Sequence, residues 1–468
     1  MKLNQSNGTF WKRVLFTAVP LFLLLVFYAR WVLSNPPEST AALIAATVIA
    51  FLFALCGIRF IPQWMAAWSR KPLLPTRVAE GKRSGRFAHL HPFLQIILWL
   101  TVFRVSLFIV AYLIVLLRDG YTGGVFDTLE LWNHLGLDSQ HYLNIAENWY
   151  ASSGDDRLLI VFMPLYPIVV RLVNYIFQNY LASGLFVSNV CCVFAGYLFY
   201  ELALLDYDRR TSLRALKYLC ILPASFLLSA PLSDSLFLLL SVACVYCMRK
   251  NQYLLSGLLG GLAAFTRAPG ILLIAPVCLE LVGQIIRELP ENRHSSRWAL
   301  QIIGNVCSML LIPAGLLLYM GVNASVTGNP LMFLTYQQEH WHQQMGWFFA
   351  TAATQMDNAL MTFSGNTAML WGLWIPNLIY LFASLGIVTA AQNKLRASNV
   401  SYFLLYYIVC MGATWLLSAP RYLTACFPLA LALGTLTEKK WVDILATIAC
   451  ATMFIAYLYA FANQWYVY

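Results

Sequence analysis

Apolar runs recur along almost the whole chain, and they constrain its fold more than any other feature. A helix needs roughly 20 apolar residues to cross the hydrocarbon core of a bilayer. Measured against this length, the sequence predicts about thirteen membrane-spanning helices, with approximate bounds 13–33, 40–60, 95–117, 181–204, 217–231, 233–248, 252–266, 269–286, 299–321, 366–391, 399–418, 421–437 and 441–461. The predicted fold is an all-α polytopic membrane protein.

Composition agrees with this fold and excludes other classes of protein. Only 11% of the 468 residues are charged and 60% are hydrophobic, whereas about 25% of a soluble domain is charged. All eleven cysteines lie in apolar runs, where a thiol behaves as a small hydrophobe, so we expect no disulfide framework. Cys244 and Cys247 form a C-x-x-C in such a run and are expected to be core residues. The basic residues are spread over short loops, which argues against nucleic-acid binding.

The distribution of positive charge predicts the topology. With a cytoplasmic N-terminus, 23 of the 30 basic residues fall inside, including those of the loop 61–94, as the positive-inside rule requires. The segments 118–180 and 322–365 are then the long outer loops. The first holds seven of the twenty carboxylates and two amphipathic stretches, HYLNIAENWY and FMPLYPIVVRLVNYIF, typical of interfacial helices. Because long loops usually have a function, we expect any chemistry on the outer face.

The densest group of chemically useful side chains lies in the first outer loop. On a helix that begins at Asp138, the side chains of Asp138, His141 and Tyr142 share one face. Asp is also a favoured N-cap residue, so Asp138 could instead serve only to cap this helix. The local pattern leaves both interpretations open.

Three further charged residues stand beside proline turns at outer helix ends. Asp234 follows the proline of SAPLSD (229–234) and could be an N-cap. Arg267 and Arg421 lie on the outer side, against the positive-inside trend. The planar fork of Arg suits phosphate, but Arg near membrane ends can also reach toward lipid head groups. In the second outer loop, QQEHWH (337–342) suits sugar contacts or is a solvated loop.

Five segments in register resemble the PIG-V family, the GPI mannosyltransferase II group and its prokaryotic relatives. Residues 138–150 (DSQHYLNIAENWY) resemble the family signature D-x-x-H-[FY]-x-x-I-A-x-x-G-Y, and FMPLYP at 162–167 resembles F-F-P-x-[FY]-P. Residues 222–235, FTRAPG at 265–270 and PRY at 420–422 resemble three further family segments. The order and spacing agree from about residue 95 to residue 430.

The sequence also departs from this family pattern. Leu137 replaces a Trp, Trp149 stands where Gly is common, Asp234 replaces a Glu, and Ala268-Pro269 replaces Ser-Asn. The two N-terminal spans and the basic loop have no counterpart in eukaryotic members. We therefore predict an N-terminal unit, 1–94, ahead of a catalytic body, 95–468. We also expect a prokaryotic relative in a bacterial plasma membrane rather than in the endoplasmic reticulum.

The resemblance implies a GT-C-like glycosyltransferase fold of 12–13 transmembrane helices. It implies inverting transfer of a hexose, mannose first of all, from a polyprenyl-phosphate donor to a lipid-linked or glycan acceptor on the outer or lumenal face. Asp138 would be the general base, and Asp234 would bind acceptor or restrain an arginine. The implied site residues are Asp138, His141, Tyr142 and Asp234 for catalysis, Arg267, Arg421 and Tyr422 for the donor phosphate, and Gln337, His340 and Trp341 for sugar or acceptor.

No cofactor is implied. Asp138, His141 and Asp234 are hard ligands that could hold a divalent metal, but no ligand spacing demands one, and we expect a metal-independent mechanism.

A polytopic transporter, or a flippase for lipid-linked sugars, is the alternative. The number of spans and Arg104, a charge deep in a predicted span, support it, since intramembrane charges often mark transport pathways. However, the carboxylates cluster in an outer loop, and no paired broken helices indicate a transport site. The sequence favours the transferase.

Overall fold

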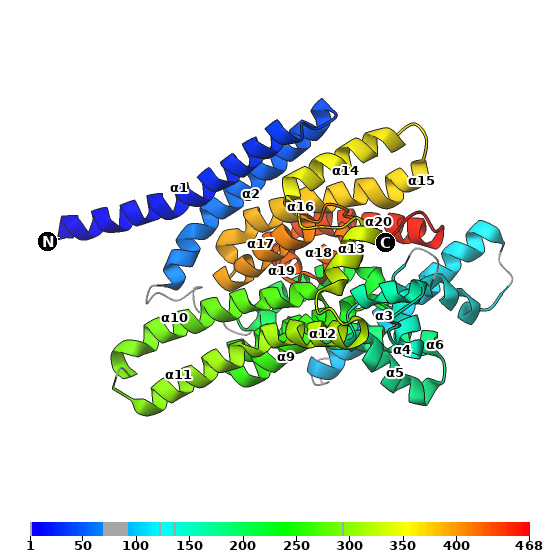
Figure 1. Ribbon diagram of the computed structural model, residues 1–468, viewed down its shortest axis with the longest axis horizontal. Helices are drawn as coiled ribbons and strands as arrows, with labels where there is room; N and C mark the ends of the chain where they lie inside the picture. Colours follow the sequence, from blue (N-terminus) through cyan, green and yellow to red (C-terminus); the bar gives the residue numbers. More distant parts are fainter. Residues whose placement is uncertain (1, 69–91, 121–122, 134–136, 293) are drawn as a thin grey trace.

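The computed structural model describes residues 2–68, 92–120, 123–133, 137–292 and 294–468, and these ranges are almost entirely helical (Figure 1). Within them no strand forms, and the β-type pairing is an isolated antiparallel bridge between Met345 and Ala413. The predicted all-α membrane architecture is confirmed. Most of the predicted basic loop 61–94 lies outside the described residues.

In the described part of the chain, eight stretches of helix are long and apolar enough to cross a membrane, and each coincides with a predicted span. They are Val14–Ser34 of α1 (Lys2–Ser34), α2 (Thr40–Ala67), Pro92–Arg118 of α3 (Pro92–Asp119), α6 (Tyr180–Leu204), η4 with α10 (Ala268–Leu273, Ile274–Asn292), α11 with α12 (Ser296–Met309, Leu311–Thr327), the run of α15, η5, α16 and η6 (Thr367–Met369, Leu370–Trp374, Ile375–Ala391, Gln392–Lys394), and α20 (Lys440–Ala462).

The other five predicted spans are shorter or broken. Helices α8 (Asp234–Arg249) and α9 (Tyr253–Thr266) have 16 and 14 residues, about 24 and 21 Å, which is short of a ~30 Å bilayer core. Helix α17 (Ala397–Met411) is similarly short. Predicted spans 217–231 and 421–437 are interrupted, because α7 (Arg209–Ile221) leads into η3 (Ser225–Ser229) and α18 (Ala419–Ala425) into α19 (Pro428–Leu436). By length and composition, the described chain thus has eight stretches that can each cross a membrane alone, or nine if the bent pair Asp155–Val161 and Leu165–Phe177 forms one span.

Prolines account for the breaks nearest to the candidate site. Leu222 ends α7 in an extended conformation (ψ 138°) directly before Pro223, as residues preceding proline tend to do. Arg267 ends α9 with φ −153° and ψ 139°, two residues before Pro269. Pro420 stands in the first turn of α18, where its missing N–H is not needed. Apolarity alone does not reveal these interruptions.

The two predicted outer loops contain helices. Segment 118–180 holds η1 (Val125–Asn133), α4 (Ser139–Asn148), η2 (Asp155–Val161) and α5 (Leu165–Phe177), so both predicted amphipathic stretches are helical. Segment 322–365 holds the end of α12, then α13 (Met332–Trp341) and α14 (Phe348–Thr362). Helix α13 packs on η2, and α12 packs on η4. These contacts bring both loops to the helix breaks.

The N-terminal helices α1 and α2 run beside each other along one edge of the molecule (Figure 1). Helix α2 also packs against α14 and α16. Ser39 accepts a capping bond from the backbone N–H of Ala42, and its hydroxyl donates to the carboxylate of Asp357 in α14 at 2.6 Å. The predicted N-terminal unit is thus in direct contact with the body through α2.

Candidate active site

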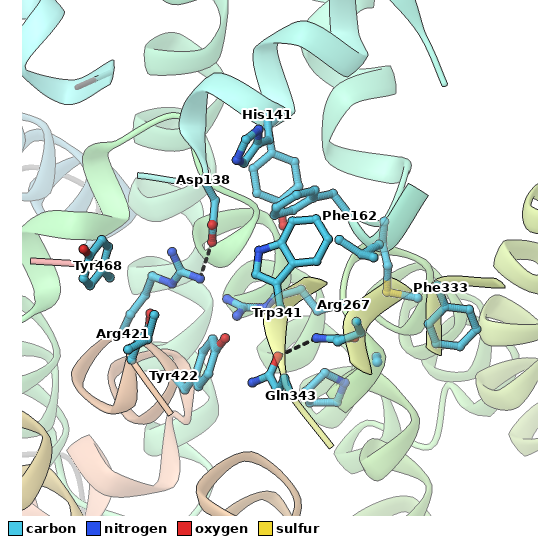
Figure 2. Close-up of a pocket in the computed structure, with 18 of the residues that line it drawn as sticks. Asp138, His141, Phe162, Arg267, Phe333, Trp341, Gln343, Arg421, Tyr422 and Tyr468 are labelled. Atoms are coloured by element: carbon cyan, nitrogen blue, oxygen red, sulfur yellow. Dashed lines mark hydrogen bonds and ion pairs between the residues drawn. The ribbon is translucent and has the colours of Figure 1, made fainter. Parts of the chain in front are cut away.

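A cavity of about 510 Å³ forms where the two outer loops meet the helix breaks (Figure 2). Its walls come from the start of α4, the segment before α5, the turn from α9 into η4, α12, α13 and the start of α18. Eight of the ten predicted site residues line it, namely Asp138, His141, Tyr142, Arg267, Gln337, Trp341, Arg421 and Tyr422. Asp234 and His340 are not among the lining residues.

Asp138 stands at the N-terminus of α4, but its side chain does not cap the helix. Its backbone is already helical, with φ −62° and ψ −7°. Its Oδ2 instead accepts a hydrogen bond of 2.6 Å from Nη2 of Arg421 (Figure 2). The carboxylate is 30% exposed, so a ligand in the cavity can reach it. Helix capping therefore does not explain why an aspartate stands at position 138.

Asp234 is a buried partner of both arginines. It begins α8, its side chain is 1% exposed, and its Oδ1 accepts a short hydrogen bond from Nη1 of Arg267. Its Oδ2 lies 3.6 Å from Nε of Arg421. This buried position suits the restraint of arginines and gives an acceptor no access to the carboxylate. Asp138, Arg421, Asp234 and Arg267 thus form a chain of alternating charges, the charge network, whose formal charges cancel.

Arg421 is the central link of the charge network. Burial opposes its charge, but the Asp138 carboxylate beside it raises the pKa of the guanidinium, which stays protonated. Its Nε is buried and has no hydrogen-bond partner in the described structure, because 3.6 Å to Asp234 is too long for a hydrogen bond. A guanidinium carries five N–H donors, so Arg421 can still bind a further anionic group.

The ring of Tyr422 packs against both arginines. Its centroid lies 4.8 Å from Cζ of Arg267 and 5.4 Å from Cζ of Arg421, within the range of cation–π attraction. The ring of Phe237 lies 6.0 Å from Cζ of Arg267. Two guanidinium groups are thereby held near each other, an arrangement that suits an oxyanion such as phosphate.

Aromatic rings form another wall of the cavity, across from Arg421 (Figure 2). The ring of Phe162 lies 4.9 Å from that of His141 and meets Trp341 edge-on at 6.2 Å. Tyr142 also packs edge-on against Phe162, and its hydroxyl lies 2.8 Å from Oγ of Ser233. Burial raises the pKa of the Tyr142 phenol, which stays neutral. Flat apolar rings beside polar groups suit a sugar, which has apolar C–H faces and polar hydroxyls.

The second outer loop contributes part of what the sequence predicts. Gln337 and Trp341, four residues apart on one face of α13, line the cavity. Nε2 of Gln337 donates to Oε1 of Gln343 at 2.5 Å. His340 is exposed and does not line the cavity, and its ring lies edge-on to Tyr336 at 6.0 Å.

Five aromatic lining residues were not singled out from the sequence: Phe162, Tyr319, Phe333, Trp415 and Tyr468. Phe162 lies in the FMPLYP segment, and Trp415 shortly precedes PRY. Proximity to a motif was therefore a usable signal for these two. Tyr319, Phe333 and Tyr468 carry no such signal, because only the packing of distant helices brings them to the cavity.

Trp149 adopts a backbone conformation that favours glycine. Its φ of 68° and ψ of −166° fall in a region that is essentially restricted to Gly, the residue of the family pattern at this position. Its ring centroid lies 5.6 Å from Cζ of Arg171, and Nε of Arg171 donates to the carbonyl of Ala146 at 2.5 Å. The chain keeps the glycine-type turn after α4 and holds it through contacts with α5.

The described residues contain no group of three or more His, Cys, Asp or Glu side chains placed to hold a metal ion. Asp138 and Asp234 face arginines, and His141 packs against Phe162. The structure does not gather these three predicted ligands into one set. The expected metal-independent mechanism stays a prediction.

Comparison with known proteins finds one family that matches part of the chain. Residues 122–323 match the family described as Mannosyltransferase (PIG-V). This match confirms the predicted resemblance over the part of the chain that holds Asp138, Asp234 and Arg267, whereas Arg421 lies beyond it. No curated protein matches the sequence.

Several solved structures are similar to the chain. The archaeal oligosaccharyltransferase AglB from Archaeoglobus fulgidus, in complex with an inhibitory peptide and a dolichol-phosphate, is 12% identical with a TM-score of 0.38, over 78% of this chain and 56% of that chain. ArnT from Cupriavidus metallidurans, bound to undecaprenyl phosphate, is 12% identical with a TM-score of 0.43, over 79% of this chain and 76% of that chain. The chain spans little more than half the length of AglB. Both scores are low, so the likeness stays general.

Proposed function

We propose that this membrane glycosyltransferase, whose residues 122–323 match the PIG-V mannosyltransferases, transfers a hexose from a polyprenyl-phosphate donor to a lipid-linked or glycan acceptor. The observation that carries the proposal is the meeting of two guanidinium groups, an accessible carboxylate and an aromatic wall in one cavity. Arginine forks suit the donor phosphate, a carboxylate can remove the acceptor proton, and the rings suit the hexose. Mannose is the first sugar to test, as the PIG-V resemblance implies.

The proposed reaction exchanges one bond at the anomeric carbon for another and moves one proton. The acceptor hydroxyl oxygen attacks the anomeric carbon, with inversion, and forms the new glycosidic bond. The bond between the anomeric carbon and the phosphate oxygen breaks, and its electron pair remains on the phosphate. The hydroxyl proton passes to the Asp138 carboxylate, while Arg267 and Arg421 stabilise the charge that develops on the leaving phosphate. Such a displacement needs no covalent enzyme intermediate.

The remaining lining residues would recognise substrate. Tyr422 would keep the two arginines in place through its ring contacts. His141, Tyr142, Gln337 and Trp341 would contact the sugar or the acceptor. The proposal places the reaction on the outer face of a bacterial plasma membrane, with the N-terminus in the cytoplasm, because most basic residues then fall inside.

The experiment is a transfer assay with the purified protein in lipid nanodiscs. Radiolabelled polyprenyl-phosphate mannose is supplied as donor and a bacterial membrane-lipid extract as acceptor, and label is expected to move into a new lipid or glycan fraction. Asp138→Asn is the control, because it keeps the side-chain size and removes the base. Its turnover is expected to fall by about 10²–10⁴-fold. The proposal is refuted if no polyprenyl-phosphate hexose serves as donor.

The alternative, a polytopic transporter or a flippase for lipid-linked sugars, was supported by the number of spans and by Arg104. This side chain is 4% exposed, and its Nη1 donates to the carbonyl of Ser225 at 3.0 Å and to the hydroxyl of Ser229 at 3.3 Å. Both acceptors belong to the broken segment between α7 and α8, so Arg104 has a structural role there. Vesicle uptake of lipid-linked sugar without transfer would favour the alternative.

A further inference from the structure

We infer that Asp138 competes as an internal anion with the donor phosphate for Arg421, so that exchange of the two on Arg421 frees the carboxylate to act as base. The inference rests on the proposed function and adds a coupling between donor binding and activation of the base. It follows from the distances and exposures within the charge network.

The first step concerns the two roles proposed for Asp138 and Arg421. Oδ2 of Asp138 lies 2.6 Å from Nη2 of Arg421, so this oxygen is engaged as a hydrogen-bond acceptor. The same bond occupies one of the donors that a phosphate would use. While this ion pair is intact, Oδ2 of Asp138 is therefore not free for the acceptor proton, and Nη2 of Arg421 is not free for the phosphate.

The second step identifies which ion pair can exchange. Asp234 is 1% exposed and does not line the cavity, so no ligand can take its place on Arg267 or Arg421. Asp138 is 30% exposed and lines the cavity. When it leaves Arg421, its charge can be hydrated in a space of about 510 Å³. Of the two carboxylates, Asp138 is the one that an incoming anion can replace.

The third step concerns the capacity of Arg421. Its Nε is buried beside Oδ2 of Asp234, so a phosphate in the cavity would bind the terminal nitrogens of the guanidinium, which carry four of its five N–H donors. A phosphate presents several acceptor oxygens and can engage more than one N–H of a guanidinium. The exchange replaces a single short bond to a carboxylate by a contact with more acceptors. This gain favours the phosphate.

The charges remain balanced through the reaction. The four groups of the charge network sum to zero, and a donor phosphodiester adds one negative charge. After transfer, the leaving phosphate monoester carries about two negative charges, while Asp138 has gained the acceptor proton and is neutral, so the total is unchanged. A protonated Asp138 no longer competes for Arg421 when the phosphate gains its second charge. Loss of that proton to water restores the ion pair and favours product release.

The test is a binding measurement that needs no turnover. Radiolabelled undecaprenyl phosphate is titrated onto the purified wild-type protein, Asp138→Asn and Asp138→Ala. Both variants are expected to bind about tenfold tighter, the lower end of the range for loss of a competing charged hydrogen bond. Glu339→Gln is the matched control, because Glu339 is exposed on α13 and does not line the cavity. It removes the same charge near the site and should bind as the wild type does.

The outcomes separate the inference from the proposed function. If the wild type does not bind undecaprenyl phosphate, the proposed donor class is wrong. If the wild type binds but neither Asp138 variant binds more tightly, the inference is overturned while the proposed function stands. A structure of the wild-type protein with undecaprenyl phosphate bound gives a readout without variants. The Asp138–Arg421 contact is expected to be replaced by a phosphate oxygen, and its persistence at 2.6 Å would overturn the inference.

Discussion

Replacement of Asp234 by asparagine should destabilise the protein more than the same change at Asp138. Asp234 is 1% exposed and faces both Arg267 and Arg421. Its loss leaves two guanidinium groups with Asp138 as their remaining carboxylate. Removing one partner of a buried ion pair destabilises a protein by about 3–5 kcal/mol. Asp138 is 30% exposed, and its replacement leaves Asp234 in place, so a destabilisation on the order of 1 kcal/mol is expected there.

The assay is the apparent midpoint of thermal unfolding at one fixed scan rate for each purified variant. An unfolding entropy of about 2.1 cal/mol/K per residue gives on the order of 1 kcal/mol/K for this chain. Asp234→Asn should therefore lower the midpoint by about 3–5 °C, and Asp138→Asn by roughly 1 °C. Combining Asp234→Asn with Arg267→Met removes one uncompensated charge and should recover part of the loss. Equal midpoints for Asp234→Asn and Asp138→Asn would refute the assignment of Asp234 as the buried anchor.

Three further predictions concern the arginines, the turn after α4 and the topology. Arg267→Lys and Arg421→Lys should each raise the donor KM about tenfold or more and lower turnover, because Lys lacks the planar fork. Unchanged steady-state kinetics would leave both arginines with only a structural role in the charge network. Trp149→Gly should be more stable than Trp149→Ala, because both variants lose the ring but only Ala retains about 1–3 kcal/mol of backbone strain. Thermal midpoints in the reverse order would contradict this. A single cysteine introduced in 61–94, in a variant without native cysteines, should react with an impermeant thiol reagent only after the membrane is opened, and labelling of intact cells would reverse the topology.

Hydrophobic length predicted the fold class and the long spans, since a helix that crosses a bilayer alone must be both long and apolar. It failed where apolar helices are short. The apolar pattern predicts a full span at α8 and another at α9, yet these helices have only 16 and 14 residues. At Leu222 the proline that follows ends a helix within a continuous apolar run. Such breaks depend on backbone conformation, which the apolar pattern does not record.

Residue types and motif resemblance predicted most of the site, but they could not predict how its charges pair. Asp138 had two open interpretations, cap or chemistry, and the absence of a capping bond together with the Arg421 contact decides against the cap. The two residues are separated by 283 positions, so no local pattern connects them. The sequence places Asp234 among the catalytic residues. Only its burial in the structure shows that it can restrain the arginines but cannot be reached by an acceptor. Tyr468 reaches the cavity through packing alone.

Asp138 and Asp234 are the same residue type in the same charge network, and only their environments give them different roles. Moving Asp234 away would leave the buried Arg267 without its carboxylate and Arg421 with Asp138 alone, which is strongly unfavourable. Moving Asp138 away transfers its charge into a cavity that water can enter, so the loss is small and a phosphate on Arg421 can offset it. Environment commonly divides acid, base and supporting roles between paired carboxylates in this way. In the proposed mechanism, one carboxylate therefore holds the two arginines in place throughout the reaction, while the other becomes a base only when the donor phosphate has taken its position.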